Sequence, residues 1–426
     1  MRHDPILPGT ALVLALLAAC SGQGPSGAGV VVMDTIGDTI VAHTGSPGAW
    51  GAAEAAVTRE VLIGKLEGAD EYTFGRINNV AVAENGNIYV LDGQVPVVRR
   101  YAPDGQHIAS FGRSGGGPGE LKQVDGLALM RDGRVLVRDP GNGRINVYDS
   151  TGTPLSTWQI RGGSFFSETL YAFAGDDVYT SVIAGHRADG SSVIGYVQLR
   201  AGVVQDTVLP PYQDFTPQVL TAARVTKSGS SRSSNIVPFS SFAHRSWSPE
   251  GRFVGGISSR YSIDTFRPDG KVFRIEHEYT PVAVQAGERA AAVERITRNM
   301  RNTDPAWRWN GPQPPEQKPP FRGIAVGQDG RIWVLLHTEA SRQPPDPEAR
   351  PDPRGLPPLE VWTEPSVYEV FEAAGSYLGR VRLPDTFTPH VMRGELLWGI
   401  ERDDLGVEYV ARYRVTPPAA NGEGNN

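Results

Sequence analysis

"NNVAVAENGNIYVLD" (78–92) and "DGLALMRDGRVLVRD" (125–139) are two copies of one pattern. In each copy, a short apolar run leads into a polar turn that ends in glycine, and a second apolar run follows. Asn-Gly or Asp-Gly between alternating apolar runs is typical of a β-hairpin. The pattern recurs in "HRSWSPEGRFVGG" (244–256) and "RGIAVGQDGRIWVLL" (322–336). A hairpin that recurs along a chain predicts a repeat protein built from β-strands.

The repeat unit is larger than one hairpin. Two weaker copies of the first hairpin bring their number to six, and they lie at 171–183 and 389–401. After most copies a second hairpin turns at a glycine, in 97–112, 145–158, 262–276 and 367–381. Each unit therefore contains four antiparallel strands, which we call A to D. Six such units predict an all-β fold, a six-bladed β-propeller of four-stranded antiparallel blades.

The ends of the chain predict how the ring closes. The sixth unit ends at its third strand, "VEYVARYRV" (407–415), and only a polar tail follows. The missing fourth strand is present just before the first unit, as "REVLIGKL" (59–66). We therefore expect an N-terminal strand to complete the last blade, which leaves only short, protected sheet edges. A further hairpin or strand in 30–43 has no position that the sequence predicts.

The glycine-rich stretch Gly112–Gly119 is not a phosphate-binding loop. No Gly-Lys-Ser/Thr closes it, and the residues after it form a hairpin where a dinucleotide site would begin a helix. Glycine permits the positive φ angles that a tight crossing needs. We therefore expect this stretch to join strand D of the first blade to strand A of the second.

Residues 78–158 resemble NHL repeats, and "FGRSGGGPGEL" (111–121) is similar to the linker between their blades. The whole of 58–415 resembles the six-bladed, TolB-like propellers of bacterial envelope proteins. "LLWGIERDDLGVEYVARYRV" (396–415) resembles the last blade of a group of uncharacterised bacterial lipoproteins. The resemblance implies a propeller lipoprotein of the cell envelope.

The N-terminus resembles a bacterial export signal. "LAAC" (17–20) resembles a lipobox, and Cys20 is the single cysteine of the chain. The resemblance implies that residues 1–19 are a lipoprotein signal peptide and that Cys20 is lipidated. An ordinary signal peptide with an incidental cysteine is the alternative. If Cys20 is lipidated, the resemblance to bacterial lipoproteins implies that Ser21 after it directs the protein to the outer membrane, with the propeller extracytoplasmic. Residues 20–57 would form a flexible tether with the extra N-terminal strand or strands, and 416–426 a disordered tail.

Composition excludes some functions. The chain has 426 residues and a net charge of -6, which argues against nucleic-acid binding because that needs a basic surface. One cysteine permits no disulfide within the chain and no cysteine-based metal site. We expect a monomer that is held at a membrane by its lipid.

The long insertions predict where a ligand binds. In a propeller, the B–C loops and D–A connections share one face, and all three insertions belong to these classes: 207–243, 280–321 and 338–361. Long loops on one end of a rigid scaffold usually carry binding. Within them, 286–302 has the apolar spacing of an amphipathic helix. This helix either packs on the propeller rim or binds a partner.

Candidate ligand-binding residues lie at the channel mouth on that face and in the insertions. They are Asn79, Asp125, His244, Arg245, Trp307, Trp309, Arg322 and His337. The alternative is that the polar residues at the mouth only bind water. The ordinary pKa of histidine would let His244 titrate near neutral pH. Trp307 and Trp309 precede a proline-rich run, which suits either a recognition surface or a loop pinned to the rim.

Three functions are compatible with the sequence. The first is a membrane-anchored binding module or scaffold for an envelope protein, a peptide or a glycan, without catalysis or cofactor. The second is a metal-dependent hydrolase or lyase, because lactonase-like six-bladed propellers hold a divalent metal in the channel. The third is a purely structural envelope protein. No Gly-x-Ser-x-Gly or His-Glu-x-x-His motif is present, and fold alone cannot choose between these functions.

Overall fold

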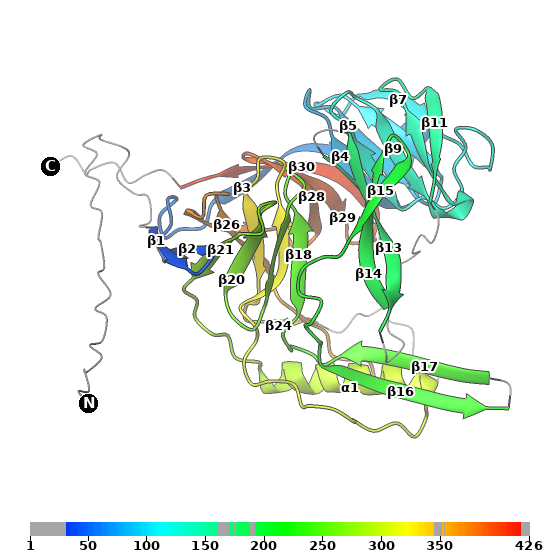
Figure 1. Ribbon diagram of the computed structural model, residues 1–426. Helices are drawn as coiled ribbons and strands as arrows, with labels where there is room; N and C mark the ends of the chain where they lie inside the picture. The colour runs from blue at the N-terminus through cyan, green and yellow to red at the C-terminus, as the bar shows by residue number, and fades with distance from the viewer. Residues whose placement is uncertain are drawn as a thin grey trace, which may run out of the picture.

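The computed structural model describes residues 31–160, 170–173, 176–187, 192–227, 229–344, 352 and 354–418. These residues form a six-bladed β-propeller (Figure 1), which confirms the fold predicted from the repeats. The signal peptide, Cys20 and residues 419–426 lie outside the described residues.

The first three blades follow one another along the chain, and each is an antiparallel sheet of four consecutive strands. Blade 1 contains β4 (Ile77–Val82), β5 (Ile88–Asp92), β6 (Val97–Tyr101) and β7 (His107–Phe111). Blade 2 contains β8 (Gly126–Leu129), β9 (Val135–Asp139), β10 (Arg144–Tyr148) and β11 (Pro154–Gln159). Blade 3 contains β12 (Leu170–Ala172), β13 (Asp177–His186), β14 (Ser192–Arg200) and β15 (Val203–Val208).

The other three blades contain most of the additions to the fold. Blade 4 contains β18 (Ala243–Trp247), β19 (Phe253–Ile257), β20 (Ser262–Phe266) and β21 (Val272–His277). Blade 5 contains β22 (Phe321–Val326), β23 (Ile332–Leu336), β26 (Ser366–Phe371) and β27 (Tyr377–Leu383). Blade 6 contains β28 (Phe387–Arg393), β29 (Leu396–Arg402), β30 (Glu408–Thr416) and β3 (Ala56–Ile63).

Blade 6 closes the ring with an N-terminal strand, as predicted. β3 pairs antiparallel with β30, from Ala56 opposite Thr416 to Ile63 opposite Val410. The strand covers 56–63 and so begins and ends three residues earlier than the expected 59–66. The apolar pattern identified the strand, but its limits are set by the register with β30, which lies more than 300 residues away.

The N-terminal hairpin, whose position the sequence did not predict, extends blade 4. β1 (Val32–Ile36) pairs antiparallel with β2 (Thr39–Thr44), and β2 pairs in parallel with β21, the outer strand of that blade. Blade 4 is therefore a six-stranded sheet. Ala42 of β2 is fully buried against Phe273 and Ile275 of β21 in one hydrophobic cluster.

The hydrophobic core is divided among the interfaces between neighbouring blades. Six clusters of buried side chains join blades 1 and 2, 2 and 3, 3 and 4, 4 and 5, 5 and 6, and 6 and 1. Trp333 in the 5–6 interface and Trp398 in the 6–1 interface are almost completely buried. Because both faces of these sheets are covered, consecutive strand residues are buried, and all five residues of β5 and of β9 are buried.

A buried aspartate at the end of strand B organises the connections in blades 1 and 2. Asp92 is fully buried and accepts the backbone N–H groups of Gly75 and Val95, each at 3.0 Å, and the guanidinium of Arg99 at 2.9 Å. Asp139, also fully buried, accepts the N–H of Gln123 at 3.0 Å. These carboxylates satisfy loop N–H groups that would otherwise be buried without partners. The two carboxylates therefore hold the loops in place.

The glycine-rich stretch joins β7 to β8, and Gly112, Gly115 and Gly119 all have positive φ angles. The expected turn between blades 1 and 2 is therefore present. The two short 3₁₀ helices, η1 (Asp70–Tyr72) and η2 (Pro140–Asn142), lie in other connections.

The insertions between blades 3 and 4 and between blades 4 and 5 build one small layer. It comprises the hairpin β16 (Val219–Thr226) and β17 (Gly229–Ile236) and the helix α1 (Ala286–Thr303), which run side by side below the blades in Figure 1. Ile296 and Met300 of α1 pack on Leu220 of β16. The helix therefore packs within this layer, which we call the platform. A two-residue pair, β24 (Ser341–Arg342) and β25 (Trp362–Thr363), lies in the third insertion.

α1 is anchored to the propeller through a buried cation. Lys318 Nζ lies 2.7 Å from Glu288 Oε1 of α1 and 3.0 Å from Glu364 Oε1, just beyond the blade 5 insertion. No helix among the described residues is long and apolar enough to cross a membrane.

Candidate functional site

The inner strands of three blades bulge where they reach the channel mouth. The pairing of β4 skips Asn78, that of β22 skips Arg322, and that of β28 skips His390. A β-bulge leaves one residue outside the ladder and redirects its side chain, and bulges are frequent next to functional sites. The mouth of the channel is therefore lined by side chains that the regular hairpin pattern would place elsewhere.

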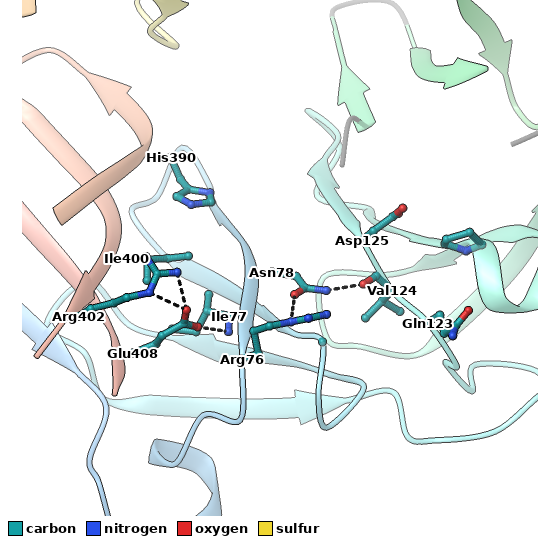
Figure 2. Close-up of a pocket in the computed structure, with 12 residues that line it drawn as sticks. Arg76, Ile77, Asn78, Gln123, Val124, Asp125, His390, Ile400, Arg402 and Glu408 are labelled. Carbon is teal, nitrogen blue, oxygen red and sulfur yellow. Dashed lines mark hydrogen bonds and ion pairs between the residues drawn. The ribbon is translucent and has the colours of Figure 1, made fainter. Parts of the chain in front are cut away.

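A cavity of about 660 Å³ opens at this mouth between blades 1, 2 and 6 (Figure 2). It lies where strands A begin and strands B end, which is the face from which the three long insertions leave. Blade 1 supplies Asn78, blade 2 Asp125 and blade 6 His390. A pocket of this size holds small organic ligands in other proteins.

Asn78 is held in place by two hydrogen bonds and a neighbouring glycine. Its Oδ1 accepts Arg76 Nε at 3.0 Å, and its Nδ2 donates to the carbonyl of Val124 at 2.5 Å. A Cβ on Gly93 would lie only 2.1 Å from Asn78 Nδ2. Gly93 therefore leaves the space that the Asn78 side chain fills, and Asn78 links blade 1 to blade 2.

The wall from blade 6 is a charged pair. Glu408 Oε1 accepts Arg402 Nε at 3.1 Å and Arg402 Nη2 at 2.6 Å. Its second oxygen accepts the backbone N–H of Ile77 at 2.6 Å. Asp125 is likewise paired with an arginine, the fully buried Arg138 of β9. Both carboxylates that line the cavity therefore also make ion pairs within the propeller.

His390 was not predicted from the sequence. It is half-buried and hydrogen-bonds to no described residue. Burial, and then the nearby Arg402 charge, lowers the pKa of His390 to about 4, so the imidazole is neutral at neutral pH. The weak repeat copy 389–401 contains this residue, but only the bulge in β28 directs it into the mouth. A local sequence pattern does not show such a bulge.

Four of the eight predicted residues lie on the other side of the mouth, in blades 4 and 5. The ring of His244 packs edge-on against Phe321, with 5.5 Å between ring centroids. Burial, and then the charge of His337, lowers the pKa of His244 to about 4. The expectation that His244 titrates near neutral pH is therefore wrong, because the ordinary value of histidine applies to a solvated ring. Arg245, next to it on β18, is exposed.

His337 and Arg322 are engaged in internal contacts centred on Glu364. His337 Nδ1 lies 3.0 Å from Glu364 Oε1, and Arg322 donates to the carbonyls of Leu336 at 3.1 Å and Pro365 at 3.2 Å. Burial acts to raise the pKa of Glu364, but the hydrogen bond and charge of His337, together with Thr338 N–H and Lys318, lower it to about 2. The sequence did not identify Glu364, which lies just beyond the third insertion.

The two tryptophans are packing residues in this structure. Trp307 is 4 % exposed in the platform core, and its Nε1 donates to the carbonyl of Thr221 at 2.8 Å. Trp309 is partly buried beside it, and its Nε1 donates to Gly311 O at 3.0 Å. Trp307 offers no open ring face of the kind that the recognition hypothesis requires, whereas Trp309 is only partly buried. Of the adjacent asparagines on β4, Asn78 lines the cavity and the predicted Asn79 does not.

The described residues contain no group of three or more His, Cys, Asp or Glu side chains that could hold a metal ion. The possible metal ligands in the cavity lining are the carboxylates of Asp125 and Glu408, two amides and one imidazole, and both carboxylates are paired with arginine. A divalent metal in this cavity would have to compete with arginine for both carboxylates.

Comparison with known proteins agrees with the repeat pattern. The chain is 27 % identical over 160 residues to the mouse protein "NHL repeat-containing protein 3", and this match covers 37 % of the chain and 42 % of the mouse protein. The chain thus spans less than half of that relative. No protein-family model matches the chain.

Solved structures with similar strand arrangements are distant in sequence. A member of the DUF4221 family from Bacteroides vulgatus is 12 % identical, with a TM-score of 0.47, over 85 % of this chain and 99 % of its own. A virginiamycin B lyase from Staphylococcus aureus is 11 % identical, with a TM-score of 0.40, over the same shares. By its own strand pairing the chain is a six-bladed β-propeller, and its sequence is similar to that of an NHL-repeat protein.

Proposed function

We propose that the protein is an extracytoplasmic binding module whose channel-mouth cavity holds part of a glycan, a peptide or another envelope molecule. One observation carries the proposal. Polar side chains from blades 1, 2 and 6 converge on a 660 Å³ cavity, and several retain unused hydrogen-bonding groups. His390 and the Gln123 amide make no hydrogen bond to a described residue, and Arg76 uses only Nε.

The surrounding structure is suited to binding because it is rigid. Glu408 joins blade 6 to Ile77 of blade 1, and Asn78 joins blade 1 to Val124 of blade 2. A ligand that enters the cavity meets a wall in which Glu408 and Asn78 are already held in place. Pre-organisation of this kind reduces the entropy lost on binding.

A lipid on Cys20 would hold the module at the bacterial envelope, with the outer membrane as its location. The support is the sequence "LAAC" (17–20), in which the only cysteine occupies the position that a lipobox requires. Cys20→Ser should abolish fatty-acid labelling and release the protein from the membrane fraction. Labelling that persists in this variant would contradict the anchor.

The binding function is tested with purified Cys20→Ser protein on arrays of glycans and peptides from bacterial envelopes. A ligand of the cavity should bind at least about tenfold more weakly to His390→Ala, because a partner group is then left unpaired. His186→Ala is the matched control, since His186 is exposed on β13 of blade 3. If both substitutions weaken the binding of the array ligands equally, or if neither substitution weakens it, the cavity is not the binding site.

An enzyme of the hydrolase or lyase class is the second candidate, and His390 favours it. A neutral imidazole beside Arg402 could accept a proton from a bound substrate while the guanidinium stabilises negative charge. Elemental analysis of the purified protein tests the metal-dependent form. One tightly bound divalent ion per chain would favour this candidate over the binding module.

A further inference from the structure

The carboxylates that line the channel-mouth cavity are already neutralised. Glu408 is paired with Arg402 at 2.6 Å, and Asp125 is paired with the buried Arg138. No other aspartate or glutamate lines the cavity in the described part of the chain. A cationic ligand would therefore find no carboxylate that lacks an arginine.

Arg76 is a cation of the lining that is paired with no described carboxylate. It is exposed at the cavity, its Nε donates to Asn78 Oδ1 at 3.0 Å, and no described carboxylate lies within ion-pair distance of it. Figure 2 shows the Arg76 side chain beside Asn78 in the lining. The bond to Asn78 fixes the plane of the guanidinium and leaves its terminal nitrogens available.

The ion pairs of the lining leave one cation over. Asp125 is paired with Arg138 from behind the lining and Glu408 with Arg402, so neither carboxylate is paired with Arg76. His390 adds no charge at neutral pH. A ligand with one negative charge would supply the partner that Arg76 lacks.

Two polar side chains of the lining make no hydrogen bond to a described residue, and both suit the hydroxyl groups of a ligand. The Gln123 amide and the His390 imidazole each contain both a donor and an acceptor, as a hydroxyl group does. A carboxylate fills only a small part of about 660 Å³, so the rest of a ligand would extend toward these two side chains.

We infer that the cavity binds a sugar acid, with its carboxylate on the terminal nitrogens of Arg76 and its hydroxyls on Gln123 and His390. Arginine is the residue that best matches the planar geometry of a carboxylate. This inference rests on the proposed function and specifies the chemistry of the ligand at the same site.

Calorimetric titration with a matched acid and amide tests the inference. D-glucuronate should bind the full chain with Cys20→Ser at least about tenfold more tightly than D-glucuronamide, because a hydrogen bond to a charged group is the stronger one. Arg76→Gln should remove this preference. Arg224→Gln, which changes an exposed arginine on the platform, should retain it.

Other outcomes separate the inference from the proposed function. Equal binding of the acid and the amide, or no binding of glucuronate at millimolar concentration, would overturn the sugar-acid inference. Neutral array ligands that depend on His390 would then still support the proposed function. Tight, Arg76-dependent binding of the dipeptide Ala-Ala, without binding of glucuronate, would identify a peptide terminus and would also overturn it.

Discussion

Glu408 of β30 accepts the backbone N–H of Ile77 of β4 at 2.6 Å, although 331 residues separate them in the chain. The same carboxylate is paired with Arg402. This contact joins the last blade to the first exactly where the channel-mouth cavity opens. Ring closure and the candidate site are therefore parts of one arrangement.

The closing strand is tested by two neighbouring residues of β3. Ile63 is 2 % exposed in the interface of blades 6 and 1, whereas Leu62 is 43 % exposed. Ile63→Ala should lower the free energy of unfolding by about 2–5 kcal/mol, the usual cost of removing a buried isoleucine side chain. Leu62→Ala should change it by about 0.5 kcal/mol or less. Urea unfolding measures both, and equal losses would contradict closure by β3.

Gly93 is predicted to be required because of Asn78. Gly93→Ala should destabilise the protein by about 1–3 kcal/mol, the typical cost of overpacking, since its Cβ would displace the Asn78 side chain. Gly185→Ala is the control, because a Cβ at Gly185 meets no atom within 4 Å.

A double variant separates this steric clash from a backbone effect. Asn78→Ala in the Gly93→Ala background should recover part of the lost stability, as expected for residues in direct contact. A loss that is unchanged by Asn78→Ala would show that the clash is not its cause.

The Glu364 contacts predict a pH dependence of stability. The folded pKa of about 2 lies below the ordinary value of about 4.3. The stabilisation is therefore fully present above pH 4.3 and is lost as the pH falls toward 2, so Glu364→Gln should cost roughly 2–4 kcal/mol at pH 7 and much less near pH 3. Urea unfolding of both proteins at several pH values measures this. A difference that does not shrink on acidification would contradict the charged contacts.

His244 should titrate near pH 4, because burial lowers its pKa to about that value. NMR of the imidazole C–H signals, assigned with His244→Gln, measures the midpoint. Burial is the larger cause and His337 the smaller, so His337→Gln should raise the midpoint only in part. A midpoint near 6.5 would show that the ring is solvated in solution.

Trp307 should matter for the platform and not for the cavity. Trp307→Ala removes a side chain that is 4 % exposed among Leu220, Ile296 and Met300, and should cost about 3–5 kcal/mol locally. Limited proteolysis should then cut first in 219–236 or 286–312. Array ligands of the cavity should still bind, and their selective loss in this variant would restore the recognition hypothesis.

The sequence by itself determined the architecture. Hairpins such as 78–92 and 125–139 are local, and their apolar period and glycine turns are visible without any partner strand. Six copies predicted six blades, and the sixth copy, which lacked its last strand, predicted an N-terminal strand in that place. Only the limits of β3 were displaced, because they depend on its register with β30.

Tertiary structure alone decided the site. His390 enters the cavity because β28 bulges, and it meets Asn78 and Asp125 because three blades converge there. Trp307 is buried against β16, which lies about 80 residues away in the chain, because exposure depends on distant segments. Strand patterns report which residues pair locally, whereas burial and the convergence of side chains at the mouth arise from contacts between blades, which no single repeat encodes.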